Sequence, residues 1–243
     1  MSNEYNVVIG VYAGVNLISK IIEAVDKQTI KPKSITLWAH KHPDKPFVTY
    51  DYTNSADVIF CTNNYGVYPR FAVGLFGTTD RVMIFDDDTI PGPKWAENCF
   101  NTLDIVGHDA ILGARGVTID KDGREIGSFG NDRNTTEITE VDLVGHCWFV
   151  NRKHIIEMFK DPPFNPMNGE DICLSANSQI TYGCKTYVPA QPNNNPDIKG
   201  SIRPILGAQP GRLSTTLGPA THLGDRAEVA KHYIGKGWKL VND

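Results

Sequence analysis

The chain has 243 residues, of which 40% are hydrophobic and 21% are charged, and its formal net charge is −4 at pH 7. These values are ordinary for a globular domain that is long enough to bury a substantial core. The small negative charge excludes a global electrostatic attraction to nucleic acid or to acidic membranes, although it leaves room for a local basic groove.

Five cysteines are spread along the chain without a Cys-x-x-Cys pair. An odd number of scattered cysteines predicts reduced thiols in a reducing compartment rather than a disulfide framework. No apolar run approaches the roughly 20 residues that span a membrane. The polar N-terminus also lacks the apolar core of a signal peptide. We therefore expect a soluble, cytoplasmic protein with no membrane span.

Strand and helix patterns alternate along the first part of the chain. Runs of β-branched residues predict strands, and an apolar stripe at helical spacing after Asn16, a plausible N-cap, predicts a helix. The expected strands cover 7–12, 34–39, 58–61 and 82–85, and the expected helices cover 17–27 and 68–76. This order is typical of an α/β sandwich with a mostly parallel central sheet flanked by helices.

The second part of the chain continues the alternation, with an excursion of short strands or a hairpin over 115–140. The expected elements are a helix over 94–103, strands over 110–114 and 141–150, helices over 155–159 and 170–182, and a strand over 185–188. No repeat, low-complexity tract or interdomain linker interrupts them. We therefore expect a single domain over 1–243.

The composition changes from residue 189 to residue 219. Pro, Gly and Asn dominate there, apolar residues are sparse, and Arg203 and Arg212 stand out. A loop of this length in a compact domain is usually functional or disordered, so we expect a flexible loop over 189–219. A C-terminal helix over 225–235 is expected to follow it, with Asp225 as its N-cap.

Three consecutive carboxylates follow the apolar run Val82–Phe85, and a Pro-Gly-Pro segment comes shortly after them. The run predicts a strand buried on both faces, and the proline-rich segment ends it. Adjacent carboxylates repel one another and are costly to bury unpaired, so a divalent cation is their simplest partner. A solvated acidic turn is the alternative, and the preceding buried strand argues against it. The C-terminal ends of parallel strands are also where open α/β sheets bind ligands.

A second acidic pair, Glu170 and Asp171, stands at the start of a predicted helix. The helix dipole favours negative charge there, so simple capping is one interpretation of the pair. An Asn-Gly turn places both acids beside the long 189–219 loop. A carboxylate at a helix start that faces a cleft can also accept a proton from an acceptor hydroxyl.

These two motifs, in this order, resemble those of the GT-A glycosyltransferases, which transfer sugars from nucleotide-sugar donors. The segment 82–88, VMIFDDD, is similar to the Asp-x-Asp metal and nucleotide motif, and 168–174, NGEDICL, is similar to the second acidic motif. The resemblance covers about 7–188, and the local sequence around the motifs is most similar to that of family-2 and exostosin-type domains. It implies a GT-A type, Rossmann-like fold.

Carried over to this chain, the resemblance implies a metal site for Mn²⁺ or Mg²⁺. Asp88 and Asp86 would bind the cation, with Asp86 also near the ribose, and Asp87 would orient the diphosphate or the sugar. Many members of the family complete the metal site with a late histidine. His222, just before the expected C-terminal helix, is the candidate here.

The resemblance also implies a set of donor contacts. Val11, Tyr12 and Ala13 end the first strand and would line the nucleotide base. Asn64 and Arg70 precede the Asp-x-Asp motif and would touch the base or phosphates, and a bidentate guanidinium suits a diphosphate. Gly145 and Trp148 would border donor sugar and acceptor. The alternatives are that Arg70 is a surface helix residue and that Trp148 belongs to the core.

The implied reaction is metal-dependent transfer of a sugar from a nucleotide-sugar donor, favoured to be UDP-linked, to an acceptor hydroxyl. Asp171 resembles the catalytic base of inverting members, and Glu170 would contact sugar or acceptor. Exostosin-type members retain configuration, and inversion is favoured here because an Asp is available as base. A polysaccharide end or protein-linked glycan is a suitable acceptor, and nucleic acid is compatible but not favoured.

Two other classes of protein share this kind of sheet. A sugar-phosphate nucleotidyltransferase generally carries a basic, Gly-rich loop after the first strand, and residues 12–16, YAGVN, contain no basic residue. A non-catalytic sugar-binding domain is the third reading. The intact Asp88 and Asp171 argue against it, because a relaxed site tends to lose its charged residues first.

Overall fold

The computed structural model describes residues 3–12, 17–40, 56–203 and 219–243, with side chains from 224 onward in the last range. In chain order the strands are β1 (Asn6–Val11), β2 (Ile35–His40), β3 (Asp57–Cys61), β4 (Arg81–Phe85), β5 (Ile111–Ile119), β6 (Glu125–Gly130), β7 (Thr139–Val141), β8 (Leu143–Asn151) and β9 (Thr186–Val188). The helices are α1 (Ile18–Asp26), α2 (Pro69–Gly74), α3 (Trp95–Val106), α4 (Arg152–Met158), α5 (Glu170–Tyr182), the 3₁₀ helix η2 (Pro196–Ile198) and α6 (Pro219–Gly235).

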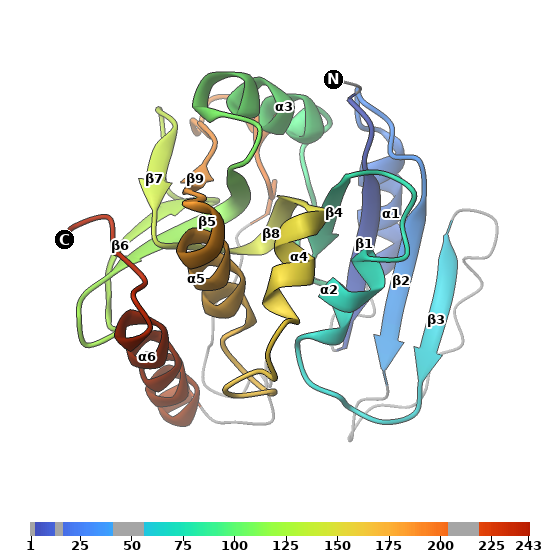
Figure 1. The fold of residues 1–243 in the computed structure, drawn as a ribbon. Helices are drawn as coiled ribbons and strands as arrows, with labels where there is room; N and C mark the ends of the chain where they lie inside the picture. The colour runs from blue at the N-terminus through green and yellow to red at the C-terminus, as the bar shows by residue number, and fades with distance from the viewer. Residues whose placement is uncertain (1–2, 13–16, 41–55, 204–218) are drawn as a thin grey trace.

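All nine of these strands belong to one sheet, which crosses the molecule in the order β3-β2-β1-β4-β8-β5-β9-β7, with β6 paired to β5 (Figure 1). The strands β3, β2, β1 and β4 run parallel to one another. The other half is mixed, because β8 runs antiparallel to both β4 and β5. The α/β fold with a helix-flanked central sheet is therefore confirmed, and the expected parallel pairing holds for the N-terminal half.

The sheet separates two hydrophobic cores. Neighbouring residues of a strand point to opposite faces, so Ile9 packs with Ile21 of α1 and Leu103 of α3, whereas Val8 belongs to the other core. That second core is covered by α2, α4, α5 and α6, and Figure 1 shows α2, α4 and α5 in front of the sheet with α1 behind it. The molecule thus has three layers, with the sheet in the middle.

The expected hairpin after the fifth strand is confirmed, since β5 pairs antiparallel with β6. The expected N-cap of the C-terminal helix is wrong. Helix α6 begins at Pro219, so Asp225 lies within it. The prediction began the helix at Asp225 because this residue type often caps helices. The helix in fact includes residues 219–224 as well. Asn16, the expected cap of the first helix, lies outside the described residues.

Residues 189–203, the first part of the segment that is expected to be a flexible loop, pack against the rest of the domain. Gln191 is fully buried, and its side chain bonds to the carbonyl of Ala114 and to the amide of Gly200. Gly200 packs so closely on Ala114 that a Cβ there would lie 2.3 Å from the alanine methyl group. This first part of the segment is held against β5, and 204–218 lie outside the described residues.

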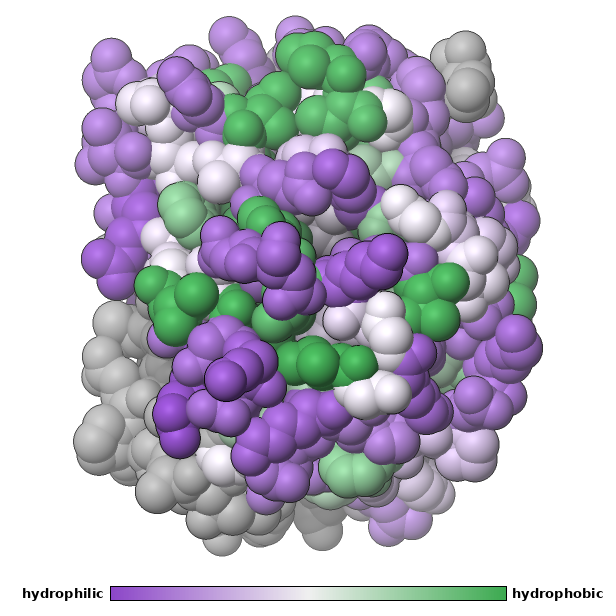
Figure 2. All heavy atoms as spheres, turned by 60° about the vertical axis from the view of Figure 1, so that its left-hand side comes forward, coloured by the Kyte–Doolittle hydropathy of each residue, from purple (hydrophilic) through white to green (hydrophobic). Residues whose placement is uncertain are grey.

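The coloured part of the face shown in Figure 2 is mainly hydrophilic, with hydrophobic residues in separate groups rather than in one continuous patch. Within the described residues, no helix combines the length and the apolar character that crossing a membrane requires.

Candidate active site

The first acidic motif stands where the expectation places it, at the C-terminal end of β4. Every residue of β4 is buried, and the chain leaves the sheet immediately after Phe85. The Asp86 amide donates to the carbonyl of His146 in β8, at 3.0 Å. On the other side, the Asp87 carboxylate accepts a hydrogen bond of 2.8 Å from the Tyr12 amide at the end of β1. Both neighbouring strands therefore fix the position of the turn.

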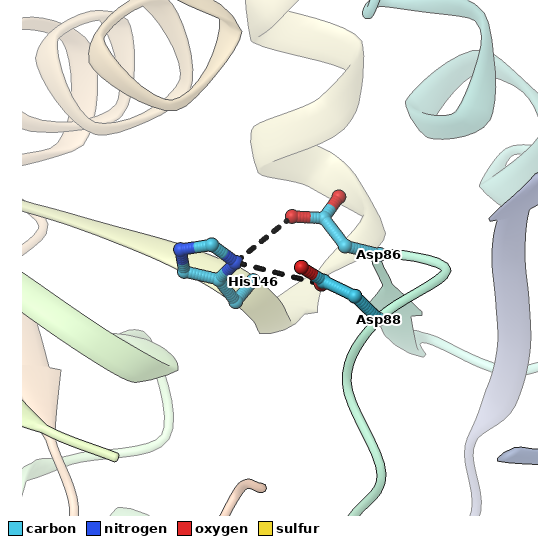
Figure 3. Close-up of side chains that lie close together, drawn as sticks. All are labelled: Asp86, Asp88 and His146. Atoms are coloured by element: carbon cyan, nitrogen blue, oxygen red, sulfur yellow. Dashed lines mark ion pairs between the residues drawn. The ribbon is translucent and has the colours of Figure 1, made fainter. Parts of the chain in front are cut away.

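A histidine that the sequence interpretation had not selected completes this site. His146 Nδ1 lies 3.3 Å from Asp86 Oδ2 and 3.9 Å from Asp88 Oδ1 (Figure 3). The ligand atoms of the three residues all lie within 4.8 Å of one another, as one metal ion requires. We call Asp86, Asp88 and His146 the strand-end cluster.

A β-bulge aims His146 at the two carboxylates. The pairing of β8 with β5 shifts register between Gly113 and Arg115, because β8 contains one extra residue there. A bulge of this kind turns a side chain away from its regular direction. His146 has a φ of 66°, in the left-handed region. That conformation costs a non-glycine residue about 1–2 kcal/mol, and such strain concentrates at functional sites.

The environment of His146 fits a cation. Burial alone would lower the pKa of His146, but the nearby, negatively charged carboxylates of Asp86 and Asp88 outweigh it and raise the pKa to about 9. At the same time, Nδ1 is buried and has no well-directed hydrogen bond to any described group, despite its short distances to the carboxylates. Two carboxylate oxygens and one imidazole nitrogen form a donor set that suits Mn²⁺ and similar divalent ions.

The second acidic motif begins α5, also as expected. Gly169, with a φ of 77°, precedes the helix, and a Cβ at this position would lie 2.8 Å from a methyl group of Val229. Only glycine fits that close contact with α6 in this conformation. The result is that Glu170 and Asp171 lie in the first turn of α5, both nearly buried. We call these two residues the helix-start pair.

Each member of the helix-start pair has its own arginine. Arg70 of α2 contacts Glu170 with a nitrogen–oxygen distance of 2.5 Å, and the same guanidinium lies 3.4 Å from Asp86. Gly10 of β1 leaves space for it, since a Cβ there would lie 2.9 Å from Arg70 Cδ. Arg226 of α6 binds both carboxylate oxygens of Asp171, at 2.9 and 2.8 Å. Arg70 thus joins the two acidic motifs into one site.

The protonation of Glu170 reflects this crowding. Burial and the neighbouring charge of Asp171 raise the pKa of Glu170 to about 7, against the opposing effect of Arg70 and Arg226. A carboxyl group in this range can hold or release a proton near neutral pH.

The donor contacts expected from the resemblance divide into several groups. Val11 has its side chain in the core, so only its backbone faces the end of the sheet. Tyr12 stacks on His40 with ring centres 4.7 Å apart. Ala13 lies outside the described residues, as does the side chain of His222, whose backbone is part of α6 rather than of a preceding loop.

Asn64 and Trp148 make contacts within the protein that support the fold. The Asn64 side chain accepts a hydrogen bond of 2.8 Å from the Gly66 amide and so stabilises a turn. Trp148 is only 2% exposed and lies beneath the Arg70 guanidinium, 5.0 Å from its carbon. The expected sugar-stacking surface on Trp148 is therefore covered, and the core interpretation is correct. Gly145 faces Asp171, since a Cβ there would lie 4.0 Å from Oδ2.

The sequence interpretation missed His146 and Arg226. His146 stands next to Gly145 in a segment that was assigned to a strand, where regular alternation gives no indication of a bulge. Arg226 is separated from Asp171 by 55 residues, and only the packing of α6 on α5 brings them together. The sequence offers one signal for each residue: His146 is a polar residue within a mostly apolar strand pattern, and Arg226 is a charged residue near the start of the predicted C-terminal helix.

No protein-family model and no curated protein matches this sequence. Among solved structures, 298 chains match. One of the most similar is S. aureus TarS, with a TM-score of 0.52 and 13% identity over 77% of this chain. A second is S. aureus TarS 1–349, with a TM-score of 0.51 and 11% identity. A third is TarS 1–349 in complex with UDP, with a TM-score of 0.52 and 12% identity. Each of these two also covers 77% of this chain.

This chain spans 37% of the length of TarS, and 60% and 58% of the two shorter chains. At these identities the likeness concerns the fold. It confirms the α/β, Rossmann-like fold with a helix-flanked central sheet that the alternation of strands and helices predicts.

Proposed function

We propose that this protein is a metal-dependent glycosyltransferase that moves a sugar from a nucleotide-sugar donor, with UDP favoured, to an acceptor hydroxyl. The observation that carries the proposal is the strand-end cluster, three ligand atoms within 4.8 Å of one another at the tip of a buried central strand. Arg70 links Asp86 of this cluster to Glu170, and a second acid, Asp171, is the next residue after Glu170. A similar fold has been solved with UDP bound, which supports the choice of nucleotide.

Asp86, Asp88 and His146 would hold the cation, and Mn²⁺ is favoured over Mg²⁺ because one ligand is an imidazole. When bound, the cation neutralises the negative charge that develops on the departing diphosphate. Arg70 keeps Asp86 and Glu170 in place, and its charge adds to the positive potential at that end of the sheet.

Asp171 is the general base of this mechanism. It takes the proton from the acceptor hydroxyl while the acceptor oxygen attacks the anomeric carbon. Attack from the side opposite to the leaving diphosphate inverts the anomeric configuration. Glu170 contacts the sugar or acceptor, and a glycan or another hydroxyl-bearing molecule is the acceptor. The five cysteines are free thiols, and we assign the enzyme to the cytoplasm on that basis.

Thermal unfolding with UDP and Mn²⁺, separately and together, tests the proposal. We expect the pair to raise Tm by several degrees and either component alone to raise it less, because the diphosphate and the cation bind each other as well as the protein. A panel of nucleotide sugars, assayed for metal-dependent donor hydrolysis, then identifies the sugar without an acceptor. No shift with any nucleoside diphosphate plus metal, and no hydrolysis across the panel, would refute the proposal.

A further inference from the structure

The bidentate contact between Arg226 and Asp171 is the least expected feature of the site. Nη1 and Nη2 of Arg226 reach Oδ1 and Oδ2 of Asp171 at 2.9 and 2.8 Å. The arginine side chain is 15% exposed and that of the aspartate 9%. A fork-to-fork arrangement of this kind fixes both the position and the plane of a carboxylate.

Stability alone is a weak explanation for this pair. Burying two charges costs desolvation free energy that the mutual attraction barely offsets, so well-packed apolar residues usually serve a fold as well. Helix α6 already has apolar contacts with the rest of the core, through Val229 and Tyr233. The arginine also has its two terminal nitrogens committed to Asp171, so a phosphate group of a substrate would have to displace that carboxylate.

The orientation that Arg226 imposes has a chemical consequence. Asp171 Oδ1 accepts a further hydrogen bond of 2.8 Å from the Ile172 amide, whereas Oδ2 is the oxygen that faces Gly145 of β8. Gly145 carries no side chain that would stand between Asp171 Oδ2 and the backbone of β8. An acceptor hydroxyl bound next to Gly145 would therefore meet Oδ2 before Oδ1.

We infer that Arg226 is a positioning residue for the general base: it holds the Asp171 carboxylate ionised and turns Oδ2 toward the acceptor hydroxyl. This inference rests on the proposed function. In the transfer step, the acceptor oxygen forms a bond to the anomeric carbon and its proton passes to Asp171 Oδ2. The bond between that carbon and the diphosphate oxygen breaks, and its electron pair leaves with the diphosphate. Asp171 then returns the proton to solvent.

The charged groups around Asp171 come from four elements. Glu170 is its neighbour on α5, Arg226 lies on α6, and Arg70 of α2 interacts with it at longer range. Burial lowers the pKa of Arg226, but the negative charges of Asp171, Glu170 and Glu125 of β6 outweigh it and raise this pKa. Removing Arg226 removes the cation closest to Asp171, which makes its charged form less favourable.

The test compares Arg226→Gln and Arg226→Lys with the wild type in a steady-state transfer assay across pH. For Arg226→Gln we expect kcat to fall about 100-fold and the donor KM to change less than about threefold. The acidic limb of the pH–rate profile should move up by about one pH unit or more, because the base loses its closest cation. Arg226→Lys keeps the charge but loses the fork, so its acidic limb should stay in place while kcat falls about tenfold.

Two further measurements separate positioning from folding. Free guanidinium, at a concentration that leaves Tm unchanged, should restore part of the activity of Arg226→Gln. Lys231→Met, on the same helix and half exposed, should match the wild type in kcat and pH profile. An unmoved acidic limb in Arg226→Gln, or no rescue by guanidinium, would overturn the inference while leaving the proposed function in place. A wild-type protein without donor binding or transfer would overturn both.

Discussion

The two acidic clusters of this site are neutralised in different ways. The helix-start pair receives its cations from the fold, because Arg70 and Arg226 contact Glu170 and Asp171 at distances of 2.5 to 2.9 Å. The strand-end cluster has a histidine in that role, and shares Arg70 with the helix-start pair at a longer distance of 3.4 Å.

This difference separates two kinds of chemistry. A carboxylate bound to a guanidinium keeps its charge and its orientation, which suits a group that must accept a proton in one direction. Carboxylates that face an imidazole can exchange a proton for a metal ion, because the neutral imidazole is itself a ligand. We therefore expect substitutions in the two clusters to fail in different assays.

The largest effect is expected from Asp88→Ala in the strand-end cluster. Loss of this ligand should abolish the Tm increase with UDP and Mn²⁺ and reduce metal-dependent donor hydrolysis about 1,000-fold, since a bound cation contributes several kcal/mol to the transition state. Asp80→Ala is the matched control, because Asp80 lies just before the other end of β4 with a side chain that is 88% exposed. Equal metal-dependent activity in Asp88→Ala and the control would remove the strand-end cluster from the mechanism.

Asp171→Asn should separate the two clusters. The amide keeps the size of the carboxylate and one acceptor for Arg226, so binding of UDP and Mn²⁺ should stay near that of the wild type. Transfer should fall about 100-fold or more, because the general base is lost. Calorimetric titration of UDP with Mn²⁺ and a transfer assay measure the two quantities. An unchanged transfer rate would reject Asp171 as the base.

His146→Asn tests the ligand that only the structure shows. Asparagine tolerates the left-handed backbone at this position better than most residues, so the bulge should persist. The affinity for Mn²⁺ should fall at least about tenfold, as the site loses its only nitrogen donor among the described residues. His108→Asn, at a half-exposed histidine beside Asp104, is the control. If both variants bind Mn²⁺ as tightly as the wild type, then His146 is not a ligand.

The smallest effect concerns stability in the metal-free protein. The pKa of His146 is raised from 6.5 to about 9, so its protonated form stabilises the fold fully below pH 6.5 and this contribution disappears as the pH rises through 9. We expect the difference in unfolding free energy between wild type and His146→Asn to shrink by about 1–3 kcal/mol over that range. Urea unfolding with a chelator present, at pH 6, 7.5 and 9.5, measures it. A difference that is independent of pH would show that Asp86 and Asp88 do not hold the proton on His146.

The sequence predicted the parts of this protein that depend on local chemistry. The apolar run before Asp86 predicts a buried strand, and three adjacent carboxylates at its end require a cation or solvent. Alternation of strands and helices predicted the α/β fold, in which helices flank a central sheet. Both motifs lie where that reasoning placed them, at the end of β4 and the start of α5.

Tertiary structure alone decided which partners these acids have. His146 lies beside Asp86 where β8 carries one extra residue opposite β5, and register is a property of two strands rather than of one. Arg226 reaches Asp171 because α6 packs on α5 through contacts such as Val229 with Gly169. Local sequence determines where a charge stands along the chain, but only the packing of distant elements determines which charge it meets.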